Sequence, residues 1–421
     1  MKQATVSHTI TAVLINTLRF VLAAVFIFSG FVKATDPLGT VYKLGDYAEA
    51  FGLGAAVPPH GVLLLAAMLL CLFEFVLGIC LLFTIWRRTT LALTLAFLCF
   101  MTPLTLYLAV ANPVADCGCF GDAIVLTNWQ TFWKNVILLA ITIPVLINNE
   151  CLVRLIHRNT QWVISGFAIV SLGLFMRANL RHLPLIDFRP YHIGANFEAS
   201  MAVPEDAPQP RYDTYFTLSK DGQVQEFTLD DYPDSTWTFV SSRTVLREKG
   251  YEPPIHDFAL IDSEGDDITS DLFEPGWRFL LVMNKLQYED MLDVINDLYD
   301  YATINDCPFY ALTSATGADM EQWRDDTGAN YDFYTADDIT LKTIIRSNPG
   351  LLLVHDGTIV GKWSKHDIPR ELSFDTPPQQ QEWVTSLAAT RQRRLTRTLF
   401  AMTFPYVFIA LLDFLVRRKK N

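Results

Sequence analysis

Six long apolar runs alternate with polar segments along this chain. They cover residues 11–32, 62–86, 91–110, 129–147, 162–176 and 399–416. A helix needs about 20 mostly apolar residues to cross a bilayer, and the fifth run reaches that length only if it begins near Thr160. The first run is long and is followed by Lys33, Asp36 and Pro37, so we interpret it as a retained helix rather than a signal peptide. The pattern predicts an α-helical membrane bundle with a four-helix core and two further transmembrane helices.

Polar and apolar residues mix between the first two runs. Six apolar positions recur there at helical spacing, and Asp46 and Glu49 stand among them: Leu38, Val41, Tyr42, Leu44, Tyr47 and Phe51. This spacing predicts an amphipathic helix on the rim of the bundle, or an ordinary loop helix.

The segment between the fifth and sixth runs reads as a soluble α/β domain. It begins with a proline-containing linker at Pro204, Pro208 and Pro210. Strands are expected at residues 212–218 and 224–229, joined as a hairpin through residues 220–222, and at 258–261, 278–283, 309–313, 351–354 and 358–363. A helix is expected over 288–303, which makes a small α/β sandwich. The expected units are 8–150 (four-helix domain), 160–177 (fifth helix), 178–249 (linker and hairpin), 250–390 (soluble domain) and 398–416 (last helix).

Composition agrees with a membrane protein and excludes other classes. Of 421 residues, 51% are hydrophobic and only 19% are charged, which is low for a soluble chain of this length. The net charge is -12 and no basic run indicates nucleic-acid binding. Seven cysteines in so long a chain do not form a disulfide framework. Cys71, Cys80 and Cys99 fall within apolar runs and are expected to be small buried hydrophobes.

The distribution of basic residues predicts the orientation. Arg87, Arg88, Arg154, Arg158 and the basic residues at 417–420 lie on one side if all six runs span, which places the amino terminus inside. The segment 177–397 is then outside, and we expect a multi-pass protein of a bacterial inner membrane with a large periplasmic domain. Four arginines depart from this rule: Arg391, Arg393, Arg394 and Arg397. Long translocated domains are largely exempt from it. If the fifth run does not span, the domain lies in the cytoplasm.

Two cysteines stand in the polar loop DCGCFGD, residues 116–122. Cys117 and Cys119 are separated by one glycine, so they can close a small strained disulfide, whose strain raises its reduction potential. Asp116 and Asp122 disfavour thiolates, and Lys33 or Lys134 would compensate if they reach the same mouth. Three readings stay open: exchangeable redox chemistry, a fixed disulfide staple, and metal binding. The last has little support because no histidine stands nearby.

Charged residues inside the runs are the other candidates. Arg19 and Glu74 are expected at similar depth, where an ion pair either lines a cavity for quinone and protons or fixes helix register. Lys134 follows Trp129, Phe132 and Trp133, so it is either an interfacial anchor or a neighbour of the cysteines.

Several motifs resemble the DoxX family. They are Leu18-Arg19-Phe20, residues 28–33 (FSGFVK) with Asp36-Pro37, and residues 74–78 (EFVLG). The DCGCFGD loop resembles the MauE branch of that family, the redox-associated membrane proteins of methylamine utilisation. This resemblance, which spans about residues 8–150, implies a four-helix bundle comparable to disulfide-forming membrane oxidoreductases. Quinone would be the electron partner, and a thioredoxin-like protein an associated component.

The soluble region resembles a thioredoxin-fold domain. Residues 255–260 (IHDFAL) with Gly265 are similar to its opening strand and turn, and residues 347–353 (SNPGLLL) to the segment that carries the cis-proline, here Pro349. Where a Cys-x-x-Cys pair should follow the strand at 279–283, the sequence reads NKLQY, residues 284–288. The domain therefore cannot perform dithiol chemistry alone, and we expect Cys307 to be a core residue.

Two hypotheses follow. In the first, the chain is a thiol–disulfide and quinone oxidoreductase: Cys117 and Cys119 take electrons from an extracytoplasmic protein and pass them to quinone near Arg19 and Glu74, without a metal. In the second, it is a non-catalytic envelope scaffold that uses its thiol-less domain as a binding surface. A transporter is a weaker alternative, since no inverted repeat is visible.

Overall fold

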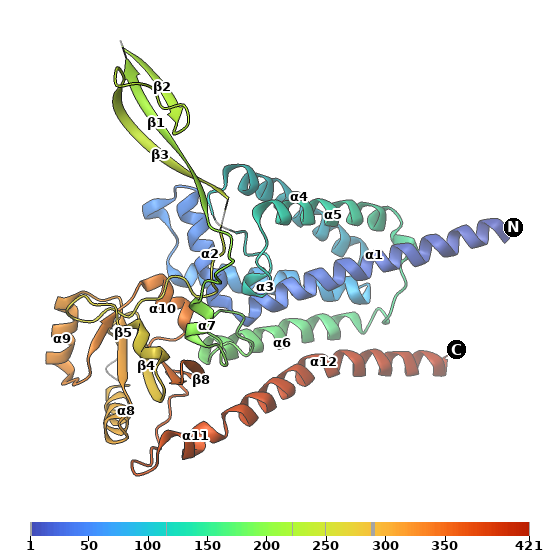
Figure 1. Ribbon diagram of the computed structural model, residues 1–421. Helices are drawn as coiled ribbons and strands as arrows, with labels where there is room; N and C mark the ends of the chain where they lie inside the picture. The colour runs from blue at the N-terminus through green and yellow to red at the C-terminus, as the bar shows by residue number, and fades with distance from the viewer. Residues whose placement is uncertain (1, 115, 221, 249, 288–290, 421) are drawn as a thin grey trace.

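The computed structural model describes residues 2–114, 116–220, 222–248, 250–287 and 291–420. Six of its helices are long and apolar enough to cross a membrane. They are α1 (Lys2–Thr35), α3 (His60–Phe83), α4 (Arg87–Ala111), α5 (Asn128–Ile147), α6 (Gln161–Arg181) and α12 (Leu387–Lys420). All six expected apolar runs, including the short fifth, are thus confirmed as helices of spanning length. Figure 1 shows both termini at one end of the bundle and the sheet-containing region at the other.

Helices α1 and α3 pack closely because each has a glycine that faces the backbone of the other helix. A Cβ atom on Gly30 would lie 2.5 Å from the Phe75 nitrogen, and one on Gly78 would lie 2.6 Å from the Ile27 nitrogen. No side chain fits at either contact. The pair of glycines therefore fixes the register of α1 against α3, which decides what Glu74 meets.

We expect Gly30→Ala to destabilise the bundle by about 1–3 kcal/mol, because the added methyl group must push two helices apart. A Cβ atom on Gly173 in α6 would meet no other atom within 4 Å. Gly173→Ala should therefore be neutral or stabilise by about 0.5–1 kcal/mol. Unfolding of the purified full chain in mixed detergent micelles measures both changes. Equal effects of the two substitutions would contradict the close packing described for Gly30.

The α/β region (residues 255–386) contains a mixed five-stranded sheet in the order β6-β5-β4-β7-β8. Strands β4, β5 and β6 are parallel, and β7 runs antiparallel to both β4 and β8. Their bounds are β4 Trp277–Met283, β5 Phe309–Thr313, β6 Phe333–Thr335, β7 Gly350–His355 and β8 Thr358–Ser364. The β7–β8 hairpin and strands β4 and β5 confirm four of the expected strands.

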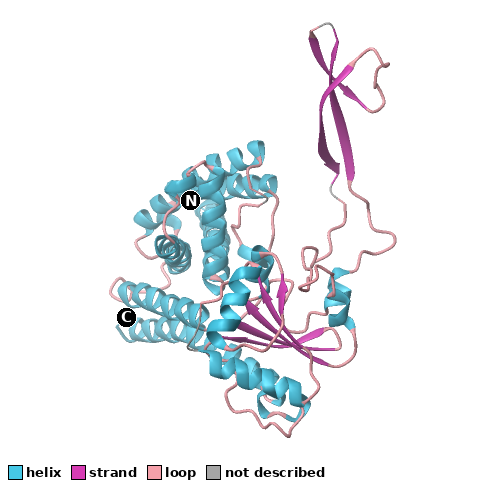
Figure 2. Ribbon diagram, turned by 90° about the vertical axis from the view of Figure 1, so that its left-hand side faces the viewer, coloured by secondary structure: helices cyan, strands magenta, loops and turns pink. Residues whose placement is uncertain are grey.

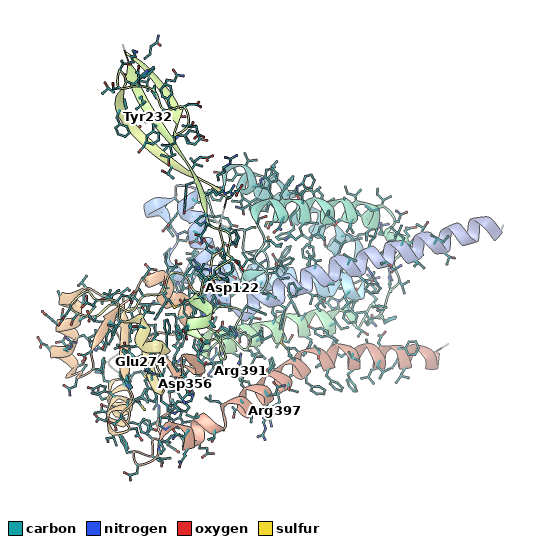
Figure 3. All side chains as sticks on the ribbon, in the orientation of Figure 1. Asp122, Tyr232, Glu274, Asp356, Arg391 and Arg397 are labelled. Carbon is teal, nitrogen blue, oxygen red and sulfur yellow. The ribbon has the colours of Figure 1, made fainter. Side chains whose placement is uncertain are left out.

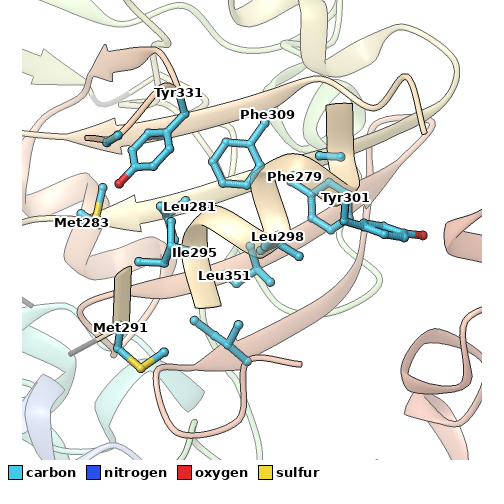
Figure 4. Close-up of a cluster of buried hydrophobic side chains, with 14 of the residues drawn as sticks. Phe279, Leu281, Met283, Met291, Ile295, Leu298, Tyr301, Phe309, Tyr331 and Leu351 are labelled. Carbon is cyan, nitrogen blue, oxygen red and sulfur yellow. The ribbon is translucent and has the colours of Figure 1, made fainter. Parts of the chain in front are cut away.

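Helices cover both faces of this sheet. Alternate residues of β4 point to opposite sides, so Phe279 and Leu281 pack with α8 (Leu292–Ile304), whereas Leu280 and Val282 pack with α10 (Asp338–Ile344). Figure 4 shows the first of these clusters, and Figure 2 shows the sheet among its helices. The remaining short elements are α7 Phe197–Met201, α9 Gly317–Thr327, α11 Glu382–Thr385 and the 3₁₀ turns Gly54–Ala56, Gly121–Ala123, Asn149–Cys151, Thr269–Phe273 and Pro378–Gln380.

Two expectations for this region need correction. Residues 258–261 are not a strand: Phe258 and Leu260 are buried, but only Ile261 forms isolated bridges, to Asp267 and Thr335. The expected helix at 288–303 is observed from Leu292, and residues 288–290 lie outside the described part of the chain. The apolar character of this segment thus reflects the burial of Phe258 and Leu260 rather than membership of a strand.

A three-stranded ribbon projects from the rest of the molecule (Figures 1 and 2). Its strands are β1 (Arg211–Lys220), β2 (Gln223–Thr228) and β3 (Thr238–Glu248), in the order β2-β1-β3. The expected hairpin is therefore confirmed as β1 and β2, although Asp221 of its turn lies outside the described residues. The third strand was not expected from the sequence.

The rim helix is also observed. Helix α2 (Pro37–Ala50) begins after Asp36, whose carboxylate accepts the backbone N–H of Gly39 at 3.0 Å, and Val41 and Ala48 are buried beneath it. Because Asp36 caps α2 and proline occupies the first turn, the helix starts directly at the end of α1.

Candidate functional site

The cysteine loop joins α4 to α5 and is held by helix α2. Lys43 Nζ lies 2.7 Å from Asp116 Oδ2, and the Tyr47 hydroxyl donates to the Cys117 carbonyl oxygen at 2.8 Å. Gly118 has a φ of +64°, which permits the tight bend between the two cysteines. Its N–H donates to Asp116 Oδ1 at 2.8 Å. Asp116 therefore shapes the loop and pairs with Lys43. From the sequence alone, we expected only that its negative charge would disfavour thiolates.

The two sulfur atoms are in contact. Cys117 Sγ and Cys119 Sγ lie 3.1 Å apart, as two thiols sharing a hydrogen bond. The hydrogen bond from Cys117 lowers the pKa of Cys119 to about 6; burial opposes this, and the charges of Lys134 and Lys33 support it. The same hydrogen bond, together with burial, raises the pKa of Cys117 above its ordinary value. The contact thus favours Cys119 as the thiolate of the pair, with Cys117 as its hydrogen-bond donor.

This asymmetry predicts the pH dependence of alkylation. In the reduced full chain, the rate at which iodoacetamide modifies Cys119 should be half-maximal near pH 6, because the thiolate is the reactive form. Cys117→Ala removes the hydrogen bond that lowers the pKa most, so the midpoint should move upward toward the ordinary thiol value of about 8.5. Peptide mass spectrometry across a pH series measures both midpoints.

Cys307 is an internal control for that experiment, because burial raises its pKa to about 11. It should stay unmodified where Cys119 reacts. A Cys119 midpoint that does not respond to Cys117→Ala would contradict the thiol–thiolate contact.

A buried polar cluster lies directly beneath the loop. Lys33 Nζ contacts both carboxylate oxygens of Glu74, at 2.7 and 2.6 Å. The Ser29 hydroxyl lies 2.7 Å from Glu74 Oε2 and 2.8 Å from the Cys119 carbonyl oxygen, and Lys33 Nζ donates to Ser29 Oγ at 3.2 Å. All three side chains are buried. The cluster therefore links an ion pair in the bundle to the backbone of Cys119.

The predicted Arg19–Glu74 ion pair is wrong. Arg19 donates instead to Thr84 Oγ1 and to the carbonyl oxygen of Val153, at 2.9 Å for the latter. Arg19 precedes Ser29 by ten residues of α1, or roughly 15 Å along a helix that rises about 1.5 Å per residue. The glycine contacts set Glu74 opposite the carboxy-terminal turns of α1, so its partner is Lys33. Arg19 instead ties the α3–α4 turn to the segment after α5.

Lys134 is brought to the cysteine loop. Its Nζ lies 4.5 Å from the centre of the Phe120 ring, a cation–π contact, and its charge acts on both thiols. The structure thus places Lys134 beside the cysteines, while Trp129 and Trp133 on the same helix are exposed as interfacial aromatics would be. Both lysines named from the sequence as compensating charges lie at the site.

A cavity of about 1260 Å³ opens at the cysteines. Its polar wall includes Cys117, Cys119, Lys33 and Glu74. Its apolar wall comes from α3 and α4: Leu63, Leu70, Phe97, Phe100, Met101 and Leu104. Arg19 is not one of its lining residues. The volume suffices for a drug-sized or cofactor-sized molecule, and the change from polar to apolar wall suits a ligand with a polar head and an apolar body.

Arg346 connects the α/β region to this cavity. Its Nε lies 2.8 Å from Asp36 Oδ2, its Nη2 lies 3.9 Å from Asp122 Oδ2, and its guanidinium stands 5.0 Å from the centre of the Tyr42 ring. Figure 3 shows Asp122 where the bundle meets the α/β region. Sequence reasoning missed Arg346 and the hydroxyl role of Tyr47. Only the tertiary fold brings Arg346 near Asp36, and Tyr47 was counted there only as an apolar position.

The other predicted thiol positions are also observed. Cys71, Cys80 and Cys307 are buried, as expected, whereas Cys99 is exposed on α4. Residues 284–287 follow β4 as expected and contain no cysteine, and residue 288 lies outside the described chain. The Asn348–Pro349 peptide bond is cis. Among described residues, no group of three potential metal ligands gathers.

Comparison with known proteins identifies two segments. Residues 212–249, which include most of the ribbon, match a Domain of unknown function (DUF8463). No curated protein matches the chain. The resemblances to DoxX proteins and to thioredoxin-fold domains stay predictions. The N-terminal apolar helices α1, α3, α4 and α5, with the cysteine loop between the last two, lie within the segment 11–148 that matches the family Methylamine utilisation protein MauE.

Proposed function

We propose that this protein is a membrane thiol–disulfide oxidoreductase associated with methylamine utilisation. Cys117 and Cys119 would accept electrons from a dithiol of an extracytoplasmic protein and pass them to a membrane quinone. The α/β region would lie in the periplasm of a bacterium and the helices in its inner membrane. The observation that supports the proposal is that the two cysteines whose sulfurs are in contact line a cavity whose wall turns apolar.

The first half-reaction is a thiol–disulfide exchange. A thiolate of the partner attacks one sulfur of the oxidised Cys117–Cys119 pair, forms a mixed disulfide and releases the other sulfur as a thiolate. The second partner thiolate then attacks the mixed disulfide. The partner leaves with a new disulfide. Cys117 takes up one of the two protons that the partner thiols released, so the pair holds the two electrons as a thiol and a thiolate.

The second half-reaction returns the pair to the disulfide. Reduction of a quinone to a quinol takes the two electrons of the pair and two protons, of which Cys117 would supply one and water the other. The chain's own part is to keep Cys119 as a thiolate, to hold the second proton on Cys117, and to bind an apolar body against Phe97, Phe100 and Leu104. Lys33 and Glu74 form an ion pair at the cavity wall. Arg19 has no part in this proposal because it lies outside the cavity.

Trapping the thiols in cells tests this function. Cells are quenched with acid and treated with a maleimide of high mass, so each free thiol retards the protein on a gel. We expect Cys117 and Cys119 to be partly reduced, and quinone depletion to increase the reduced fraction, because electrons then have no acceptor. A pair that is fully oxidised under every condition would show a fixed disulfide and refute cycling.

A scaffold function is the second candidate, and one observation favours it. The α/β region is joined to the cysteine loop by the buried Arg346, yet residues 284–287 provide no thiol. Such a region would serve the protein as a binding surface. If the full-length double variant Cys117→Ser/Cys119→Ser supports normal growth on methylamine and retains its co-purifying proteins, the scaffold function is favoured over the oxidoreductase.

A further inference from the structure

Four arginines form a group at the start of α12. Arg391, Arg393, Arg394 and Arg397, here called the arginine collar, are all exposed. Residues three and four apart are neighbours on a helix, so Arg391 adjoins Arg394 and Arg393 adjoins Arg397 on one broad face. Figure 3 shows Arg391 and Arg397 on the part of α12 that is nearer the α/β region. The collar is therefore a dense positive surface on a single rigid element.

The depth of the collar follows from the packing of α12. Met402 and Tyr406 are buried against the bundle, and the Tyr406 ring lies 4.9 Å from the Phe167 ring of α6. The apolar stretch of α12 begins at Leu399. At about 1.5 Å per residue, Arg397 stands roughly 3 Å and Arg391 roughly 12 Å beyond Leu399 along the axis. Long arginine side chains at this distance reach the layer of lipid headgroups.

The collar arginines have no salt-bridge partner among the described residues. Arg189, Arg346 and Lys362 each pair with an aspartate, whereas no ion pair between described residues involves a collar arginine. The collar also lies on the side of the α/β region, where basic residues are ordinarily depleted if that side is extracytoplasmic. Four adjacent positive charges held at headgroup depth are complementary to phosphate groups arranged in a plane.

We propose that the arginine collar binds the headgroup phosphates of anionic phospholipids in the leaflet next to the α/β region. Clusters of four or more basic residues beside a spanning helix have this affinity, because each adds electrostatic attraction to a negatively charged surface. Guanidinium groups also make bidentate contacts with phosphate. Bound lipids would hold the outer turns of α12, where the helix is exposed, at a fixed height above the hydrocarbon.

Native mass spectrometry of the full chain in non-ionic detergent tests this, with phosphatidylglycerol and phosphatidylcholine added separately. We expect phosphatidylglycerol to bind at least about tenfold more tightly than phosphatidylcholine, and the variant R391Q/R393Q/R394Q/R397Q to lose most of that preference. The variant with lysine at all four positions keeps the charge and should retain most of it. This second variant separates loss of lipid binding from misfolding.

The ribbon offers a charge-matched control. R211Q/K220Q/R243Q/R247Q removes four positive charges from β1 and β3, which Figures 1 and 2 show away from α12. Lipid preference should not change in this variant. An equal loss in both variants, an unchanged preference in the collar variant, or full displacement of the lipid by millimolar inorganic phosphate would overturn the proposal. An acidic protein lost from the collar variant while lipid preference stays intact would also overturn it.

Discussion

Glu74→Gln is expected to destabilise the helix bundle by about 3–5 kcal/mol, because it leaves the Lys33 ammonium buried without a carboxylate. Both side chains are almost fully buried, and Glu74 is the only acidic side chain recorded in an ion pair with Lys33 among described residues. Unfolding of the purified full chain by a denaturing detergent in mixed micelles measures the change. The loss should be accompanied by slower reduction of the cysteine pair, since Ser29 connects Glu74 to the Cys119 backbone.

Two matched variants control this result. Lys33→Met/Glu74→Leu removes both charges and should be close to the unsubstituted protein in stability, because no charge remains to be buried. Glu150→Gln removes the partner of Arg87 from a long, exposed pair, and its effect should be below about 1 kcal/mol. If Glu74→Gln is no more harmful than Glu150→Gln, the ion pair beneath the cysteine loop does not hold the bundle together.

Arg346→Met is expected to release the α/β region from the cysteine loop, with a loss of about 2–5 kcal/mol in docking free energy. The substitution keeps the apolar part of the side chain against Tyr42 but removes the charge between Asp36 and Asp122. Hydrogen–deuterium exchange of the full chain should then rise in α10 and in residues 116–127. The sheet should stay protected, since its two apolar clusters are untouched.

Lys342→Met is the control for that substitution. Lys342 also faces the Tyr42 ring, at 5.6 Å from its centre, but its ion pair is with Asp338 of its own helix rather than with an aspartate of the bundle. Its loss should therefore cost much less docking free energy than the loss of Arg346. The double variant Asp36→Arg/Arg346→Asp, which swaps the two charges, should recover part of the protection from hydrogen exchange that Arg346→Met loses. Increased exchange throughout the α/β region would instead mean that the substitution unfolds it.

The periodicity of apolar residues predicted the helices and strands of this molecule better than it predicted the contacts between them. The spanning helices, the rim helix and the β7–β8 hairpin follow from runs of apolar residues and from turn residues that local sequence displays. The pairing of Glu74 does not. It depends on which turn of α1 faces α3, and that is decided by the two glycines at positions 30 and 78. If α1 were shifted along α3 by a few turns, Arg19 rather than Lys33 would face Glu74.

The α/β region shows the same limit. Strand β6 has only three residues, too few for an alternating pattern to be visible, and α10 has seven. Residues 258–261 have apolar character, but only Ile261 bridges β6, at Thr335, so they form no strand. At the site, the two cysteines, Lys33, Glu74 and Lys134 were all found by residue type. Arg346 was not, because its significance comes only from Asp36 and Asp122, more than two hundred residues earlier in the chain.

Both ends of the α/β region are joined to spanning helices, through α6 on one side and α12 on the other. Such a two-point tether confines the region even at moments when the Arg346 ion pairs are open. Its return to the cavity mouth is then a first-order process, governed by an effective concentration of the order of millimolar rather than by abundance in the cell. Any protein that binds at the cysteines must therefore compete with the α/β region, which is covalently tethered beside them.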